Sequence, residues 1–173
     1  MNKPNTAPEA EAPKRPPPPA FTRYQSTVRS PRGHYPGVFA LANGLARSGA
    51  LTEEQWRFWR AGNDWYDANY PDPSTVDPLV YDPDHNPGAV AWFKSSPEAE
   101  PLIARLSGYL ELLTAHGVGW HELRSADPGR VVYEDAYQVV VVPYGPDAAQ
   151  RGHTGTPWFE VDDGNRFFGR HLK

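Results

Sequence analysis

The stretch Ser96-Pro-Glu-Ala-Glu-Pro-Leu-Ile-Ala-Arg-Leu-Ser-Gly-Tyr-Leu-Glu-Leu-Leu-Thr-Ala-His-Gly117 decides the fold. Ser96 is a suitable N-cap, Pro97 occupies the first helical position, and Gly117 can take the left-handed cap. Apolar residues recur between them at three- and four-residue steps, at Leu102, Ile103, Leu106, Tyr109, Leu110 and Leu113. This spacing predicts one amphipathic helix that begins at Ser96 and ends near His116.

Strand-like segments follow this helix and precede it. Val118–Ser125, Arg130–Asp135 and Tyr137–Pro143 are rich in β-branched and aromatic residues, and Asp127-Pro-Gly129 is a turn signal. The three segments predict an antiparallel meander, in which the second and third strands are neighbours. Ala89–Lys94 predicts one further strand before the helix. An apolar helix stripe and a sheet face bury each other, so we expect the core here.

Two more helices are expected nearer the N-terminus. Val38, Leu41, Ala42 and Leu45 form a stripe in Pro36–Ser48, and Thr52-Glu-Glu-Gln55 is a capping box that opens a second helix to about Asn69. The fold class is therefore α+β. A helical hairpin precedes a strand, a long helix and a three-stranded antiparallel meander, packed in two layers.

The 173 residues fit one domain between two tails. Residues 1–20 are dominated by Ala, Pro, Glu and Lys, which predicts a disordered Pro-rich tail. Residues 21–143 form the expected single domain. Residues 144–173 form a C-terminal extension, in which Asp162-Asp-Gly164 signals a short hairpin. The chain has no cysteine, which excludes disulfides and Cys-ligated zinc.

Charge is distributed unevenly along the chain. The net charge is −4, but the first 35 residues carry six Lys and Arg against two Glu, which leaves −8 on the rest. An acidic body argues against nucleic acid as a partner. The N-terminus lacks the apolar region of a secretory signal, and no apolar run is long enough for a membrane span. We therefore expect a cytoplasmic protein without membrane contact.

The densest polar and aromatic cluster is Asn63-Asp-Trp-Tyr-Asp67. Rings supply apolar contact while carboxylates fix orientation, as in pockets for small ligands. We expect Trp65, Tyr66, Asp64 and Asp67 to anchor a protein or small-molecule partner, assisted by Arg29 and Arg32. The alternative is a helix end with structural caps. We also expect Phe21–Tyr35 to be ordered against the domain, with both arginines near its carboxylates.

A small cofactor-free hydrolase or isomerase is the second function class. Its candidate residues are His121 or His34 with the carboxylate Glu134, because a histidine and a carboxylate in one cleft can transfer protons. We expect neither a metal nor a cofactor. Asp82-x-Asp84-x-Asn86 opens like a calcium loop, but Pro87 and Phe93 occupy the positions of the required Gly and Glu.

Several segments resemble a family of small uncharacterised actinobacterial proteins: Arg29-Ser-Pro-Arg-Gly, Asn63-Asp-Trp-Tyr-Asp-Ala followed by Tyr70-Pro-Asp-Pro, Ala91-Trp-Phe-Lys94, and Ser125-Ala-Asp-Pro-Gly-Arg-Val-Val-Tyr-Glu-Asp135. The resemblance covers about Arg23 to Pro143. It implies that these segments belong to one domain, and it transfers no activity, cofactor or catalytic residue.

Overall fold

The computed structural model describes residues 18–31 and 35–144 of the chain. The predictions for residues 1–17 and 145–173, including the C-terminal hairpin, lie outside this range. The elements in chain order are β1 (Phe21–Ser26), α1 (Val38–Arg47), α2 (Glu53–Asn69), a 3₁₀ turn (Pro73–Thr75), β2 (Val90–Lys94), α3 (Glu100–Arg105), α4 (Ser107–Ala115), β3 (Trp120–Ser125), β4 (Arg130–Glu134) and β5 (Gln138–Val142).

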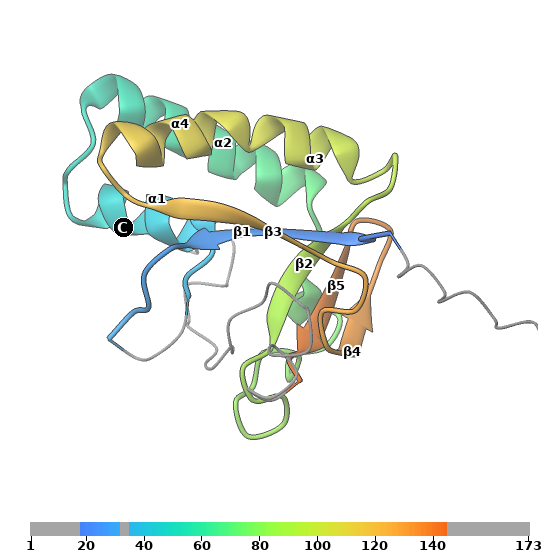
Figure 1. The fold of residues 1–173 in the computed structure, drawn as a ribbon. Coiled ribbons are helices and arrows are strands. Elements are labelled where there is room, and N and C mark those ends of the chain that lie inside the picture. Colours follow the sequence, from blue (N-terminus) through green and yellow to red (C-terminus); the bar gives the residue numbers. More distant parts are fainter. Residues whose placement is uncertain (1–17, 32–34, 145–173) are drawn as a thin grey trace, which may run out of the picture.

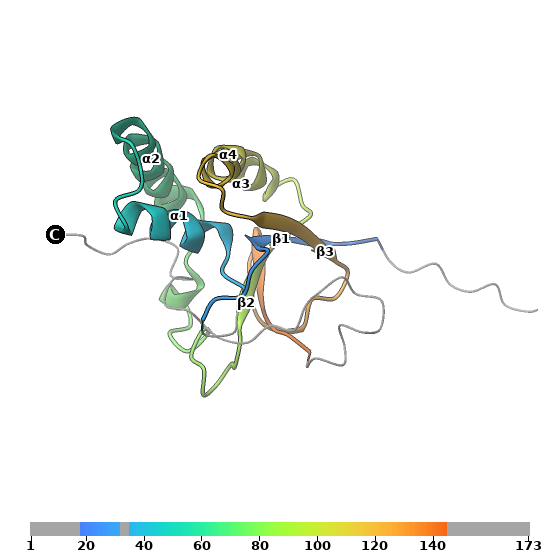
Figure 2. The same cartoon turned by 60° about the vertical axis from the view of Figure 1, so that its left-hand side comes forward.

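The architecture is α+β, as predicted. The five described strands form one antiparallel sheet in the order β3-β1-β2-β5-β4. The four α-helices of the described residues lie on the same side of β1 and β3 (Figures 1 and 2). β1 and β3 cross the direction of β2 and β5 in Figure 1, so the sheet is strongly twisted. No helix among the described residues is long and apolar enough to cross a membrane.

The pairing of the last two strands is confirmed, but the first strand of the expected meander lies elsewhere. β4 and β5 are antiparallel neighbours, with Val131 opposite Val141. β3 instead pairs with β1 along its whole length, from Phe21 opposite Ser125 to Ser26 opposite Trp120. β1 was expected only as an ordered arm. It separates β3 from the other strands and places β3 at the opposite edge of the sheet from β4.

The link between the two edge strands requires the sheet to bend. Only residues 126–129 join β3 to β4. Five residue steps span at most about 17 Å, whereas four strand spacings in a flat sheet amount to about 19 Å. A flat sheet therefore cannot accommodate this link, so the sheet must curl to bring the ends of β3 and β4 within reach of each other.

The predicted long helix begins later than expected and is interrupted once. Ser96 does cap a turn, since its Oγ accepts from the Ala99 amide at 3.3 Å, but the first helical residue is Glu100. Pro101 has no N–H to bond to the carbonyl of residue 97, so the regular ladder starts after it. Leu106 separates α3 from α4, and the C-terminal end is as predicted, with Gly117 at φ 67°.

The helical hairpin is confirmed, including the capping box of Thr52 and Gln55. α2 and α4 approach closely where Gly62 faces Tyr109: a Cβ built on Gly62 would lie 2.6 Å from the Tyr109 Oη. That hydroxyl donates to the Asn63 Oδ1 at 2.6 Å, and the Asn63 amide in turn donates to the Asn43 Oδ1. A buried polar chain therefore fixes the three helices α1, α2 and α4 against one another.

Apolar side chains cover both faces of the central strands. On the helix side, the rings of Phe39, Tyr66 and Tyr109 meet edge-on at centroid distances of 4.7 to 5.8 Å. The second buried cluster consists of Val90, Trp92, Leu123, Val139 and Val141. Because β2 and β5 are buried on both faces, they read as unbroken apolar runs rather than as alternating ones.

Candidate functional site

The second half of α2 carries four of the expected anchor residues, and it divides them between core and surface. Tyr66 is fully buried and its hydroxyl donates to the Leu102 carbonyl at 2.7 Å. Burial raises the pKa of this phenol well above its ordinary value. Trp65 is half-buried, and its ring meets that of Tyr66 edge-on at 5.1 Å. Tyr66 therefore belongs to the core, whereas Trp65 remains accessible.

The two carboxylates of this cluster face solvent. Asp64 forms an ion pair with Arg60 one turn earlier in α2, and the hydrogen bond from that guanidinium lowers the pKa of Asp64. Partial burial raises the pKa of Asp67, against the opposing charge of Arg60. Neither carboxylate forms an ion pair with Arg29 among the described residues, so the expected link between the arm and these acids is wrong for Arg29.

Trp65 is part of a surface that includes residues missed in the sequence. The guanidinium carbon of Arg105, from α3, lies 4.4 Å from the centre of the Trp65 ring. Phe58 is 40% exposed and its ring lies across Gly108 of α4, where the missing side chain leaves room for it. Ala61 is exposed between Phe58 and Trp65 on α2. We call Phe58, Ala61, Trp65 and Arg105 the α2 aromatic surface.

Arg29 lies over the Tyr35 ring at 5.4 Å, and its Nε donates to the Tyr35 hydroxyl. Val28 is 69% exposed, whereas Phe21 and Tyr35 are partly buried against the second buried cluster. Arg32 and His34 lie outside the described residues. The arm therefore contacts the domain through its strand and through Tyr35, and Arg29 contributes an aromatic contact rather than an ion pair.

Arg23 in β1 is the buried arginine of the arm. Its guanidinium donates to the carbonyls of Ala91 and Tyr35 at 2.8 and 3.5 Å and to the Gln25 Oε1 at 3.1 Å. β1 and β2 are paired only at two residues, so this side chain satisfies carbonyl groups where the strands separate. Burial lowers the pKa of Arg23 to about 10. A cavity of about 20 Å³ beside it has room for roughly one water molecule.

The structure does not bring His121 and Glu134, the two expected acid–base residues that it describes, together. His121 lies on the edge strand β3, and its Nε2 is 3.0 Å from the Nε2 of Gln25 on the neighbouring strand β1. Glu134, on the opposite edge strand β4, forms an ion pair with Lys94 at 2.6 Å. Each side chain thus has a different neighbour on a different edge of the sheet, and this pair forms no common cleft.

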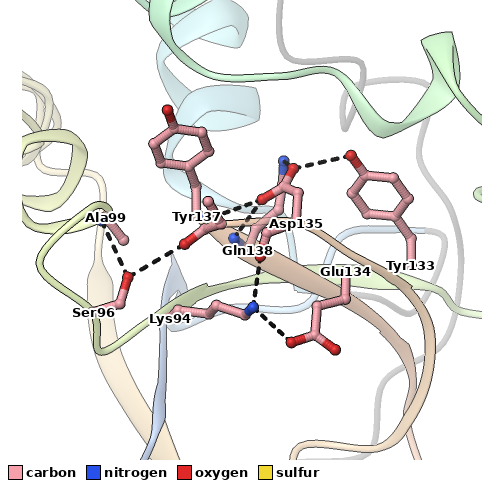
Figure 3. Close-up of polar contacts among 9 residues, drawn as sticks. Lys94, Ser96, Ala99, Tyr133, Glu134, Asp135, Tyr137 and Gln138 are labelled. Atoms are coloured by element: carbon pink, nitrogen blue, oxygen red, sulfur yellow. Dashed lines mark hydrogen bonds and ion pairs between the residues drawn. The ribbon is translucent and has the colours of Figure 1, made fainter.

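Asp135 organises the turn between β4 and β5 (Figure 3). Its Oδ1 accepts from the amides of Tyr137 and Gln138 at 2.7 and 2.9 Å. Its Oδ2 accepts from the Tyr133 hydroxyl at 3.0 Å and from the Gln138 Nε2 at 3.1 Å. Gln138 is fully buried and also donates to the Pro71 carbonyl. This carboxylate therefore ties the hairpin to the loop after α2.

The segment that resembles a calcium loop uses its carboxylates for local turns. The Asp82 Oδ1 accepts from the amides of Asp84 and His85 and lies 2.8 Å from the His85 Nδ1. The hydrogen bond from His85 lowers the pKa of Asp82, and the same bond raises the pKa of His85. Among the described residues, no three His, Asp or Glu side chains gather to hold a metal ion.

We expect the His85 imidazole to titrate with a pKa above its ordinary value of 6.5. Its contribution to stability is complete below that value and is lost as pH rises through the raised pKa. The Asp82 contribution is present above its ordinary 3.8 and is lost as pH falls through the lowered pKa. NMR titration of His85 measures this directly. Asp82→Asn should lower the midpoint toward the ordinary value, whereas Asp84→Asn should lower it less; equal effects would contradict the assignment.

These placements leave the α2 aromatic surface as the candidate site. Trp65 is the member that the sequence predicted, and the fold adds Phe58 and Arg105. The sequence held one usable signal for Phe58, because it lies seven residues before Trp65 and therefore on the same side of the helix. Comparison with known proteins found no matching family model, no matching curated protein and no matching solved structure.

Proposed function

We propose that this protein is a non-catalytic, cytoplasmic protein-interaction module that binds its partner through the α2 aromatic surface. The observation that supports this is the accessibility of two large rings, Phe58 and Trp65, beside the exposed Arg105. Arg105 forms no ion pair within residues 18–31 and 35–144. The resemblance to small actinobacterial proteins stays a prediction and adds no activity to this proposal.

The chemistry of this surface is typical of a binding hot spot. Trp and Arg are enriched among the residues that contribute most to the affinity of protein complexes. A guanidinium stacked on an indole keeps its N–H groups available at its edge, where they can donate to a carboxylate or a carbonyl of a partner. The neighbouring Ala61 has a small side chain, so a partner can approach the helix backbone between the two rings.

We expect Trp65→Ala to weaken partner binding at least about tenfold, as for a hot-spot residue, while the chain stays folded. The partner is first trapped by a photo-reactive phenylalanine analogue placed at position 61 of the full chain and identified by mass spectrometry. Binding of the purified partner to wild type and to Trp65→Ala then gives the change in affinity. Circular dichroism checks the fold.

Two controls separate the surface from the core and from non-specific capture. Tyr66→Ala removes the buried neighbour of Trp65 and should unfold or strongly destabilise the chain instead. The same photo-reactive group at Val131, which is 48% exposed on the edge strand β4, should give no adduct with that partner. An equal yield from both positions, or unchanged affinity in Trp65→Ala, would remove the α2 aromatic surface from the proposal.

A further inference from the structure

Helix α2 carries an exposed seam with the spacing of a coiled coil. Glu54, Phe58, Ala61, Trp65 and Ala68 follow one another at steps of four, three, four and three residues. Trp65 is half-buried and the other four are exposed. This spacing places all five on one stripe of the helix, about 21 Å long. The core residues Trp59, Asn63 and Tyr66 lie on a different side.

The seam is complementary to itself when two copies run antiparallel. Ala61 is its midpoint, so a two-fold axis at Ala61 places Ala61 opposite Ala61 of the partner subunit. Phe58 then packs against Trp65 of the partner subunit, at both ends of the contact. Two alanines at the axis let the helices approach closely, and the rings on either side supply the apolar area.

Charge complementarity selects the antiparallel arrangement. Glu54 falls opposite Ala68 of the partner subunit. The alanine side chain is small, so the Glu54 carboxylate can reach Arg105 of the partner subunit. That arginine is stacked on the Trp65 ring of its own chain, one helical turn from Ala68. Along one flank, Arg57 faces Asp64 of the partner subunit. A parallel arrangement would instead place Glu54 against Glu54 and Arg105 against Arg105, which like charges disfavour.

We propose that the partner bound by the α2 aromatic surface is a second copy of this chain, joined in a two-fold symmetric, antiparallel contact of α2 with α2. This inference rests on the proposed function and names its partner. The contact is isologous: the same residues serve on both sides, so one patch closes the assembly as a dimer. Two Glu54–Arg105 ion pairs fix its direction and register.

The first test measures the mass of the full chain in solution by sedimentation equilibrium over a range of protein concentrations. The chain mass is 19.3 kDa, and we expect reversible association to twice that value. Ala61→Glu places two like charges at the axis and should weaken the dimer by about a hundredfold or more. Ala61 is an exposed helical position where Glu is a good helix former, so this variant keeps its fold.

The second test exchanges the charges across the contact. Glu54→Arg and Arg105→Glu should each weaken the dimer, and the double variant should restore it, because each ion pair is rebuilt with reversed polarity. Glu111→Arg makes the same change of charge at an exposed position of α4 outside the seam and should leave the dimer unchanged. Absence of rescue, or an equal effect of Glu111→Arg, overturns the proposed contact.

The outcome also separates this inference from the proposed function. A chain that stays monomeric at every concentration, and whose photo-reactive group at position 61 nevertheless captures a different protein in a Trp65-dependent way, overturns the dimer alone. A monomer without any Trp65-dependent adduct overturns both. Association that persists in Ala61→Glu places the dimer contact on another surface and likewise overturns the inference.

Discussion

Replacing Asp135 by alanine is expected to lower the free energy of unfolding by about 3–4 kcal/mol, since four hydrogen bonds end on this one carboxylate. Two of the donors are the backbone amides of Tyr137 and Gln138, which shape the turn between β4 and β5. The third donor is the side-chain amide of Gln138, which has no access to solvent. In the variant this amide loses the Asp135 carboxylate as an acceptor and keeps the Pro71 carbonyl. Urea unfolding of the full chain measures the loss.

The neighbouring residue supplies a matched control for this prediction. Glu134→Ala also removes a carboxylate from the same hairpin, but its ion pair with Lys94 is exposed on the glutamate side. Such pairs contribute about 0–1 kcal/mol, so this variant should unfold almost like wild type. Asp135→Asn should fall between the two, because its amide oxygen can still accept from the turn amides. Equal stability of Asp135→Ala and Glu134→Ala would show that the carboxylate does not organise the turn.

The elements that could be predicted are those whose signals are local. Three such signals can each be recognised within a few residues: the capping box at Thr52, the turn glycine Gly117 and the apolar run of β5. The structure has all three. The position of β3 in the sheet could not be predicted from local sequence. Its partner is β1, about a hundred residues earlier, in a basic segment that was predicted to pack against the domain but not to form a strand of the sheet. Arg23 and Gln25 of this strand are buried because their polar groups find partners inside the fold.

The candidate site shows the same division between local and distant information. The sequence identified Trp65 and Tyr66 as one anchor, but neighbours on a helix point about 100° apart. Only packing decides which of the two side chains faces the core. The Leu102 carbonyl, which accepts the hydrogen bond from the Tyr66 hydroxyl, lies 36 residues away in the sequence. Arg105 comes from an equally distant helix. The side of α2 that remains accessible thus follows from where α4 lies, and no pattern within α2 states it.

Exchanging Gly62 for alanine is expected to lower the free energy of unfolding by about 1–3 kcal/mol. The new methyl group would lie 2.6 Å from the Tyr109 Oη and 3.0 Å from its Cζ. Tyr109 cannot move aside easily: it is 1% exposed, its ring packs edge-on against Phe39 and Tyr66, and its hydroxyl is bonded to Asn63. Overpacking costs about 1–3 kcal/mol and a lost hydrogen bond about 1, against a gain of about 1 from helix propensity.

Gly44→Ala in α1 isolates the propensity term from the clash. A Cβ on Gly44 meets nothing within 4 Å, so alanine there should stabilise the chain by about 0.5–1 kcal/mol. The two glycine variants should therefore change the urea midpoint in opposite directions. Tyr109→Phe removes the atom nearest to the new methyl group, and in a double variant with Gly62→Ala it should recover at least about 1 kcal/mol relative to additive losses. Strictly additive losses would mean that the helices α2 and α4 separate freely at this point, and that Gly62 does not set their distance.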